Sequence, residues 1–319
     1  MSELLMIAIL IFGGLVLLYF GADWLVKGAV TISLKFGLSP LIVGLTVVAL
    51  GTSLPEALVS IQATLDNQGG IALGNVIGSN ILNIALILGL SSLLQPLKVD
   101  SHLVKADVPI LFGASFLLIV LLEDFHISRM EGALLLLGIV FYVTGNIMTV
   151  KRTSPAEDQI EGMEVPEDPS KNLLRDIGFL ILGLIALALG SNFLVEGAVD
   201  LARIWGLSEA LIGLTIVSVG TGTPELATAL MAAYRKTADI AIGNAVGSNI
   251  FNIFFVVGLA GLIAPINGTQ ISPSDLYVMF GLTFLLLPTV WTGMVLDRKE
   301  GFLFVAIYVA YIYYLWTTI

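Results

Sequence analysis

The sequence contains no cysteine and very little charge. Among its 319 residues only 12% are Asp, Glu, Lys or Arg, whereas 57% are hydrophobic, and the mean hydropathy is +0.99. The absence of cysteine excludes disulfides, iron–sulfur clusters and thiol chemistry. The two histidines, His102 and His126, fall in or beside expected loops and predict neither a metal site nor a catalytic centre. Because soluble domains carry about twice this charged fraction, the composition predicts an integral membrane protein.

Apolar segments of membrane-spanning length recur along the chain. A helix needs about 20 apolar residues to cross a bilayer, and windows of that length predict an all-α protein with ten transmembrane helices. We place these helices at residues 4–25, 38–64, 71–95, 106–122, 130–149, 174–195, 209–233, 240–264, 275–294 and 301–317. They divide into a first five-helix unit at residues 1–149 and a second at residues 174–319.

The segment between the two units is strongly acidic. Between Arg152 and Lys171 the sequence has these acids and prolines: Pro155, Glu157, Asp158, Glu161, Glu164, Pro166, Glu167, Asp168 and Pro169. Low hydrophobicity, repeated acid and scattered proline are typical of a mobile linker. We therefore expect residues 150–173 to be a solvated connector, in preference to a regulatory cation-binding loop.

Two stretches, residues 44–96 and 213–265, align without a gap at a constant offset of 169 residues. Of the 56 pairs from 41/210 to 96/265, 23 are identical, and most identities are Gly, Thr, Pro, Glu, Ser or Asn, not aliphatic residues. The offset also relates Gly21 to Gly190 and Gly37 to Gly206, so the duplicated unit has five helices. Because a unit with an odd number of spans puts the second copy into the membrane in the opposite orientation, the sequence predicts an inverted-topology repeat. A site is then expected near the midplane of the membrane.

The distribution of Lys and Arg predicts the orientation of the chain. If the N-terminus is outside the cell, twelve of these residues fall in cytoplasmic loops and only two, Arg129 and Arg203, fall in outer loops. Cytoplasmic loops of membrane proteins carry an excess of Lys and Arg. We therefore expect both termini outside and the acidic linker in the cytoplasm.

Each copy places one glutamate, Glu56 or Glu225, inside an apolar segment. An ionisable residue there costs roughly 2.5 to 3.5 kcal/mol and by default indicates a functional site. The glutamate follows a Gly-Thr-x-x-Pro sequence, and Gly with Pro predicts a break in the helix. Freed carbonyl groups, hydroxyls and a carboxylate together form an oxygen ligand set that suits Ca²⁺ or Na⁺.

The third and eighth helices supply a second polar feature. Helical spacing of four residues puts Asn75, Ser79 and Asn83 on one face, and the same spacing recurs in Asn244, Ser248 and Asn252. Each feature alone has a simpler interpretation: the break could be a kink, the polar face could serve interhelical hydrogen bonds, and the glutamate could be a paired structural charge. However, no Lys, Arg or His lies in the central turns of these four helices, so two unpaired carboxylates need a cation or protons.

With both GT(S/G)xPE segments and both GNxxGSNIxN segments, the chain resembles the sodium/calcium exchangers of the calcium/cation antiporter superfamily, over nearly its whole length outside the linker. The resemblance implies that the two glutamates and neighbouring groups bind Ca²⁺ or Na⁺ alternately. The residues implied as ion ligands are Glu56, Glu225, Thr52, Ser53, Thr221, Ser79, Ser248, Asn83 and Asn252, with backbone carbonyls near Ala49 and Ser218. Two positions depart from the pattern: Gly222 replaces a serine, and Asn252 stands where several relatives have an aspartate.

These observations predict a secondary active transporter that exchanges Na⁺ for Ca²⁺ by alternating access, in the inner membrane of a prokaryote. The lipid bilayer and the two ions are the expected partners; no cofactor, nucleic acid or oligomer is required. The resemblance further implies that the first and sixth helices slide across the core. Three alternatives remain: a Ca²⁺ or other cation/H⁺ antiporter, since a glutamate pair can also bind protons, a passive cation channel, and an intramembrane hydrolase using paired acids.

Overall fold

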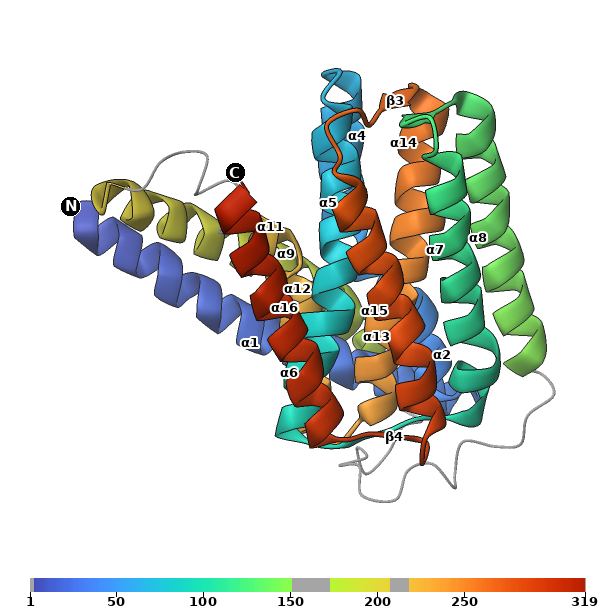
Figure 1. Ribbon diagram of the computed structural model, residues 1–319. Helices are drawn as coiled ribbons and strands as arrows, with labels where there is room; N and C mark the ends of the chain where they lie inside the picture. The colour runs from blue at the N-terminus through green and yellow to red at the C-terminus, as the bar shows by residue number, and fades with distance from the viewer. Residues whose placement is uncertain (1–2, 151–172, 207–217, 319) are drawn as a thin grey trace.

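The computed structural model describes residues 3–150, 173–206 and 218–318 (Figure 1). Within these residues the chain is almost entirely helical, and four η segments are π-helical, with a wider turn than the α-helix. The elements in chain order are α1 (Glu3–Lys35), α2 (Pro40–Val43), η1 (Gly44–Val48), α3 (Ala49–Thr52), α4 (Leu54–Leu65), α5 (Gly69–Ile81), η2 (Leu82–Leu88), α6 (Gly89–Leu94), β1 (Leu97–Lys98), η3 (Leu103–Asp107), α7 (Val108–Leu121), β2 (His126–Ile127), α8 (Arg129–Val150), α9 (Leu173–Ile204), α11 (Ser218–Thr221), α12 (Thr223–Tyr234), α13 (Ala238–Phe251), η6 (Asn252–Val257), α14 (Gly258–Ile263), β3 (Ile266–Asn267), α15 (Pro273–Trp291), β4 (Val295–Leu296) and α16 (Arg298–Thr318).

The described helices include seven that are long and apolar enough to cross a membrane, or eight if the bent pair 40–52 and 54–65 is one span. The multi-pass prediction is therefore confirmed. The remaining predicted spans are 130–149, which corresponds to the 22-residue helix α8, and 209–233, which lies partly outside the described residues. The count of ten stays a prediction, and the predicted linker at 150–173 falls almost wholly outside the described residues.

The predicted ends of the two longest helices are wrong. The first predicted helix ends at residue 25, whereas α1 continues to Lys35; the sixth ends at residue 195, whereas α9 continues to Ile204. Charged residues end the apolar run without ending the helix. In α1, Asp23 and Lys27 form an ion pair at i and i+4 with an N–O distance of 2.8 Å, which is compatible with helix. Asp23 also pairs with Arg235, which follows α12.

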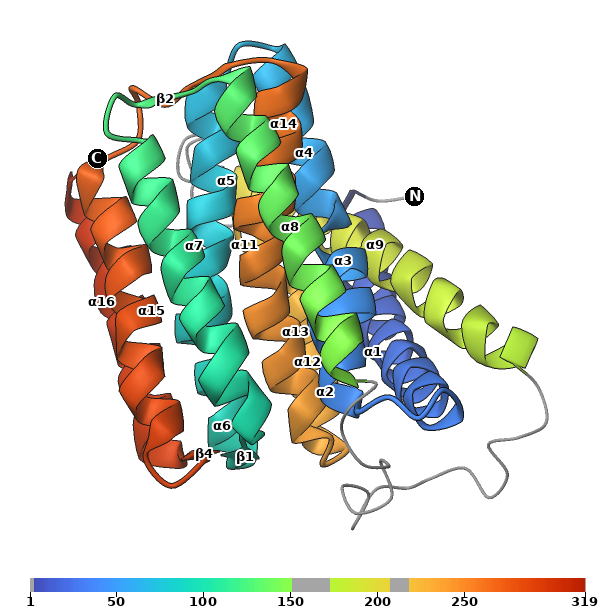
Figure 2. The same cartoon turned by 90° about the vertical axis from the view of Figure 1, so that its right-hand side faces the viewer.

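The helices α1 and α9 form a strongly tilted pair beside a more upright bundle (Figures 1 and 2). They approach each other through glycines. A Cβ atom added at Gly14 would lie 2.7 Å from the main-chain nitrogen of Leu194, and one added at Gly183 would lie 2.6 Å from that of Leu25. No side chain fits in such a contact, so these glycines set the close approach of the two backbones.

Two short strand pairs are added to the predicted all-α fold. Leu97–Lys98 (β1) pairs antiparallel with β4, and His126–Ile127 (β2) pairs antiparallel with β3. Each pair joins the first half of the chain to the second. The offset of 169 residues relates β1 to β3 and β2 to β4, yet the β1–β4 and β2–β3 pairs lie at opposite ends of the molecule (Figures 1 and 2).

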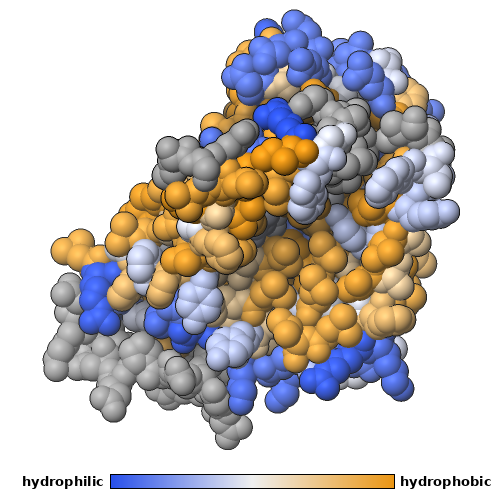
Figure 3. Space-filling model, turned by 90° about the vertical axis from the view of Figure 1, so that its left-hand side faces the viewer, coloured by the Kyte–Doolittle hydropathy of each residue, from blue (hydrophilic) through white to orange (hydrophobic). Residues whose placement is uncertain are grey.

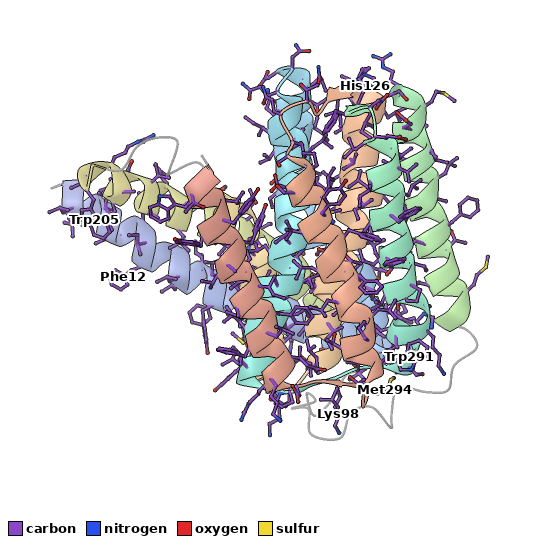
Figure 4. All side chains as sticks on the ribbon, viewed as in Figure 1. Phe12, Lys98, His126, Trp205, Trp291 and Met294 are labelled. Carbon is purple, nitrogen blue, oxygen red and sulfur yellow. The ribbon has the colours of Figure 1, made fainter. Side chains whose placement is uncertain are left out.

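The molecule has a broad apolar surface between two hydrophilic ends (Figure 3). Large apolar side chains point outward from the bundle; Phe12, for example, retains 69% of its accessible surface and Trp205 retains 72% (Figure 4). A soluble protein rarely exposes so large a contiguous apolar surface. This arrangement fits a helical bundle surrounded by lipid, with a core built mainly on α5, α13 and the π segments that follow them.

Candidate ion-binding site

The helix break predicted before Pro55 is present. Between α3 and α4 the axis bends by 41°, and Ser53, at φ −80° and ψ 0°, is the residue at the break. Gly222 occupies the same place between α11 and α12, at φ −82° and ψ 4°. In both copies the proline is the second residue of the new helix and the glutamate is the third, so Glu56 and Glu225 lie in the first turns of α4 and α12.

Both glutamates are buried. Glu56 is 0% exposed and Glu225 is 1% exposed. Neither carboxylate has a hydrogen-bond partner or an ion pair with a Lys, Arg or His among the described residues. Glu56 and Glu225 are neighbouring acids, and the Thr52 hydroxyl lies beside Glu225. Two neighbouring buried carboxylates without a positive partner form a site that a cation or protons can neutralise.

The threonines of each break contact the helix of the other half. Thr52 lies 3.1 Å from the amide oxygen of Asn244 and 3.4 Å from the Ser248 hydroxyl. Thr221 lies 3.4 Å from the amide oxygen of Asn75. The offset of 169 residues relates Thr52 to Thr221 and Asn75 to Asn244, so the two contacts are equivalent. Each half of the site is therefore assembled from both halves of the chain.

The two asparagines predicted as ligands, Asn83 and Asn252, lie at the start of the π segments. Asn83 donates its amide N–H to the Asn249 amide oxygen (2.9 Å), and Asn252 donates to that of Asn80 (3.1 Å). Within the part of the chain that the structure describes, their own amide oxygens accept no hydrogen bond. A π segment turns the following side chains relative to a regular helix.

Several of the predicted ligands have buried oxygens without a hydrogen-bond partner among the described residues. They belong to Ser53, Glu56, Ser79, Asn83, Glu225 and Asn252. Carboxylate, hydroxyl and amide oxygens of this kind are ligands for hard cations. Within the described residues no cluster of three or more His, Cys, Asp or Glu side chains could hold a metal, so any cation here is bound by two acids and neutral oxygens.

The other predicted ligands differ in their burial and in their hydrogen bonds. Ser248 is buried and contacts Thr52. The Ala49 carbonyl is not free, because it accepts a hydrogen bond of 3.0 Å from the Ser53 N–H and a longer one of 3.4 Å from the Thr52 hydroxyl. Ser218 begins α11. The sequence interpretation omitted Asn80 and Asn249 as site residues, although their identity in both copies was a signal that could have found them.

The amino-acid sequence of the chain matches a known protein family. A family profile described as sodium/calcium exchanger protein matches residues 6–148 and 176–317, which leaves out most of the acidic segment between them. The sodium/calcium exchanger MaX1 of Methanosarcina acetivorans is 33% identical over 337 residues, covering 94% of this chain and 95% of that protein. The inner membrane protein YrbG of Escherichia coli is 39% identical over 268 residues, covering 82% and 81%.

The fold is also similar to a solved structure. The sodium-calcium exchanger NCX_Mj, soaked with 2.5 mM Na⁺ and 0.1 mM Ca²⁺, superimposes with a TM-score of 0.83 at 33% sequence identity, and the match covers 98% of both chains.

Proposed function

Since the chain belongs to the sodium/calcium exchanger family, we propose that it exchanges Na⁺ for Ca²⁺ at a single site formed by Glu56 and Glu225. The protein is a multi-pass cation antiporter and not an enzyme, as its relatives indicate, so the hydrolase alternative is set aside.

The observation that carries the proposal is the pair of buried carboxylates without partners. Their combined charge matches one Ca²⁺ ion. An empty, doubly charged site in low dielectric is costly. The protein therefore changes its access side readily only when ions neutralise the site, and this requirement couples the movement of one ion to that of the other.

The arrangement of the two halves supports alternating access. Equivalent strands lie at opposite ends of the molecule (Figures 1 and 2), as expected for ten helices in two inverted five-helix repeats. Equivalent contacts, Thr52 with Asn244 and Thr221 with Asn75, meet around the glutamates. Because inverted repeats can exchange conformations, each side of the membrane can open in turn to the same site.

Exchange of Ca²⁺ for H⁺ is the second candidate. The same observation favours it, because a buried carboxylate without a positive partner readily binds a proton when the cation leaves. Purified protein in liposomes distinguishes these mechanisms: ⁴⁵Ca²⁺ uptake is measured with an imposed Na⁺ gradient, an imposed H⁺ gradient, or neither. Uptake driven by Na⁺ alone supports our proposal; uptake driven only by H⁺ contradicts it, and uptake without any counter-ion gradient indicates a channel.

Two substitutions test the residues. Glu56→Gln and Glu225→Gln preserve side-chain shape and remove half of the available charge, so each is expected to reduce Na⁺-driven uptake to background while leaving folded protein in the membrane. Glu123→Gln, on an exposed residue after α7, is the matched control and is expected to transport normally. Normal transport in either site variant would show that the glutamate is structural.

A further inference from the structure

Ser60 lies one turn beyond Glu56 on α4 and is 1% exposed. Its hydroxyl donates to the main-chain oxygen of Ala72 at 3.0 Å. The Ser60 hydroxyl oxygen itself lies 3.0 Å from the amide nitrogen of Asn75. A hydroxyl has a single proton. With that proton donated to Ala72, the Ser60 oxygen can only accept, so the group that faces it has to be a donor.

This requirement fixes the orientation of the Asn75 amide. Its nitrogen carries two protons, and it donates to Ser60 and to the main-chain oxygen of Glu56 at 3.1 Å. The amide oxygen is therefore directed to the opposite side, where it lies 3.4 Å from the Thr221 hydroxyl. A rotated amide would bring two acceptors together at both Ser60 and Glu56, which is unfavourable in a buried site.

The second half of the site lacks this support. The offset of 169 residues relates Ser60 to Ala229, which has no hydroxyl and is fully buried. Asn244, the equivalent of Asn75, accepts from Thr52 at 3.1 Å. Its amide nitrogen, however, has no hydrogen-bond partner among the described residues. Asn75 and Asn244 therefore occupy equivalent positions. The Asn75 amide is hydrogen-bonded through both its nitrogen and its oxygen, whereas among the described residues the Asn244 amide is hydrogen-bonded through its oxygen alone.

We propose that Ser60 is a positioning residue for ion binding, which acts through Asn75 on Thr221, and that its replacement by Ala229 leaves the second half of the site less pre-organised. A threonine can offer oxygen lone pairs to a cation only if its proton points elsewhere. The fixed Asn75 oxygen accepts the Thr221 proton and directs the lone pairs of Thr221 away from the amide. Thr52 faces instead the Asn244 oxygen and, at 3.4 Å, the main-chain oxygen of Ala49, and the Asn244 amide is held through its oxygen alone among the described residues. This inference rests on the proposed site.

The test is a reciprocal exchange of one hydroxyl. Ser60→Ala frees the Asn75 amide, and Ala229→Ser offers a partner to the Asn244 amide. From the net value of one hydrogen bond we expect Ser60→Ala to raise the KM for Ca²⁺ by about threefold to tenfold with little change in the maximum rate. Ala229→Ser is expected to lower the KM. Ser115→Ala is the matched control: it removes another fully buried hydroxyl, which contacts Thr283 between α7 and α15.

A second measurement does not require transport. The rise in melting temperature of purified protein with increasing Ca²⁺ reports binding directly. Ser60→Ala is expected to need several-fold more Ca²⁺ for the same rise, whereas Ser115→Ala needs the wild-type concentration. If wild type binds Ca²⁺ and Ser60→Ala has the wild-type KM and the same Ca²⁺-dependent melting curve, the positioning role is refuted. If wild type itself shows no response to Ca²⁺, the proposed function fails and the positioning role fails with it.

Discussion

Asn80 and Asn249 exchange hydrogen bonds across the junction of the two halves. The Asn80 amide nitrogen donates to the main-chain oxygen of Asn249 at 3.4 Å, and the Asn249 amide nitrogen donates to that of Asn80 at 3.2 Å. Asn83 and Asn252 add the equivalent side-chain bonds to the same pair. Four asparagines thus join α5 and η2 of the first half to α13 and η6 of the second.

Removing one of these asparagines should destabilise the protein. Asn249→Ala deletes the donor to Asn80 and the acceptor of Asn83, and leaves buried polar groups without partners. We expect a loss of about 1 to 3 kcal/mol in the free energy of unfolding, since each unpaired buried group costs about that much. Thermal melting in detergent would measure it, with the exposed Asn192→Ala as control. Equal melting temperatures for the two variants would contradict the role of this network.

A second prediction concerns the packing of α1 against α9. Adjacent glycines provide a matched pair: a Cβ at Gly14 would lie 2.7 Å from the Leu194 nitrogen, whereas a Cβ at Gly13 would meet nothing within 4 Å. Gly14→Ala should separate the two backbones and cost roughly 1 to 3 kcal/mol through overpacking, while Gly13→Ala should be neutral or slightly stabilising.

The measurement for this pair is melting temperature together with the initial rate of Ca²⁺ uptake. We expect both to fall in Gly14→Ala and neither to fall in Gly13→Ala. If the two variants behave alike, the tilted pair is not held by the contact that the structure places at Gly14.

The sequence was sufficient to locate the helix breaks and the buried glutamates. These depend on residue chemistry that is nearly independent of context: proline removes a backbone donor, and a carboxylate in an apolar segment is costly wherever it lies. The doubling of Thr52, Pro55 and Glu56 at a fixed offset further separated functional residues from generic apolar similarity.

Other features depend on contacts between distant segments and were missed. The ends of α1 and α9 could not be predicted from hydropathy, because ion pairs within the helix, Asp23 with Lys27 in α1 and Asp200 with Arg203 in α9, are compatible with its continuation. The π segments η2 and η6 have no local sequence signature that hydrophobic periodicity detects. The contact of Thr52 with Asn244 joins residues 192 positions apart, so only the folded chain shows that each threonine meets the opposite half.

A third prediction concerns orientation in the membrane. Lys98 and His126 lie near opposite ends of the molecule (Figure 4), and the excess of Lys and Arg predicts that the Lys98 end is cytoplasmic. Because the chain has no cysteine, Lys98→Cys and His126→Cys each introduce a single thiol. In whole cells we expect a membrane-impermeant maleimide to label His126→Cys readily and Lys98→Cys only after permeabilisation. The reverse pattern would invert the topology.

The last prediction follows from the neutral amide of Asn252, at a position where the family resemblance implies an acid in several relatives. Its amide oxygen is buried and accepts no hydrogen bond among the described residues, so the site contains two carboxylates. We expect Na⁺/Ca²⁺ exchange that does not require K⁺. Asn252→Asp would add a third negative charge to the proposed site, and like charges that share a site favour binding of a proton or of an additional cation. Ca²⁺ uptake with and without K⁺, from pH 6 to 8, should therefore become more sensitive to acid or to K⁺ in Asn252→Asp than in wild type. Strict K⁺ dependence of the wild type, or identical pH and K⁺ profiles for both proteins, would show that residue 252 is not part of the ion-binding site.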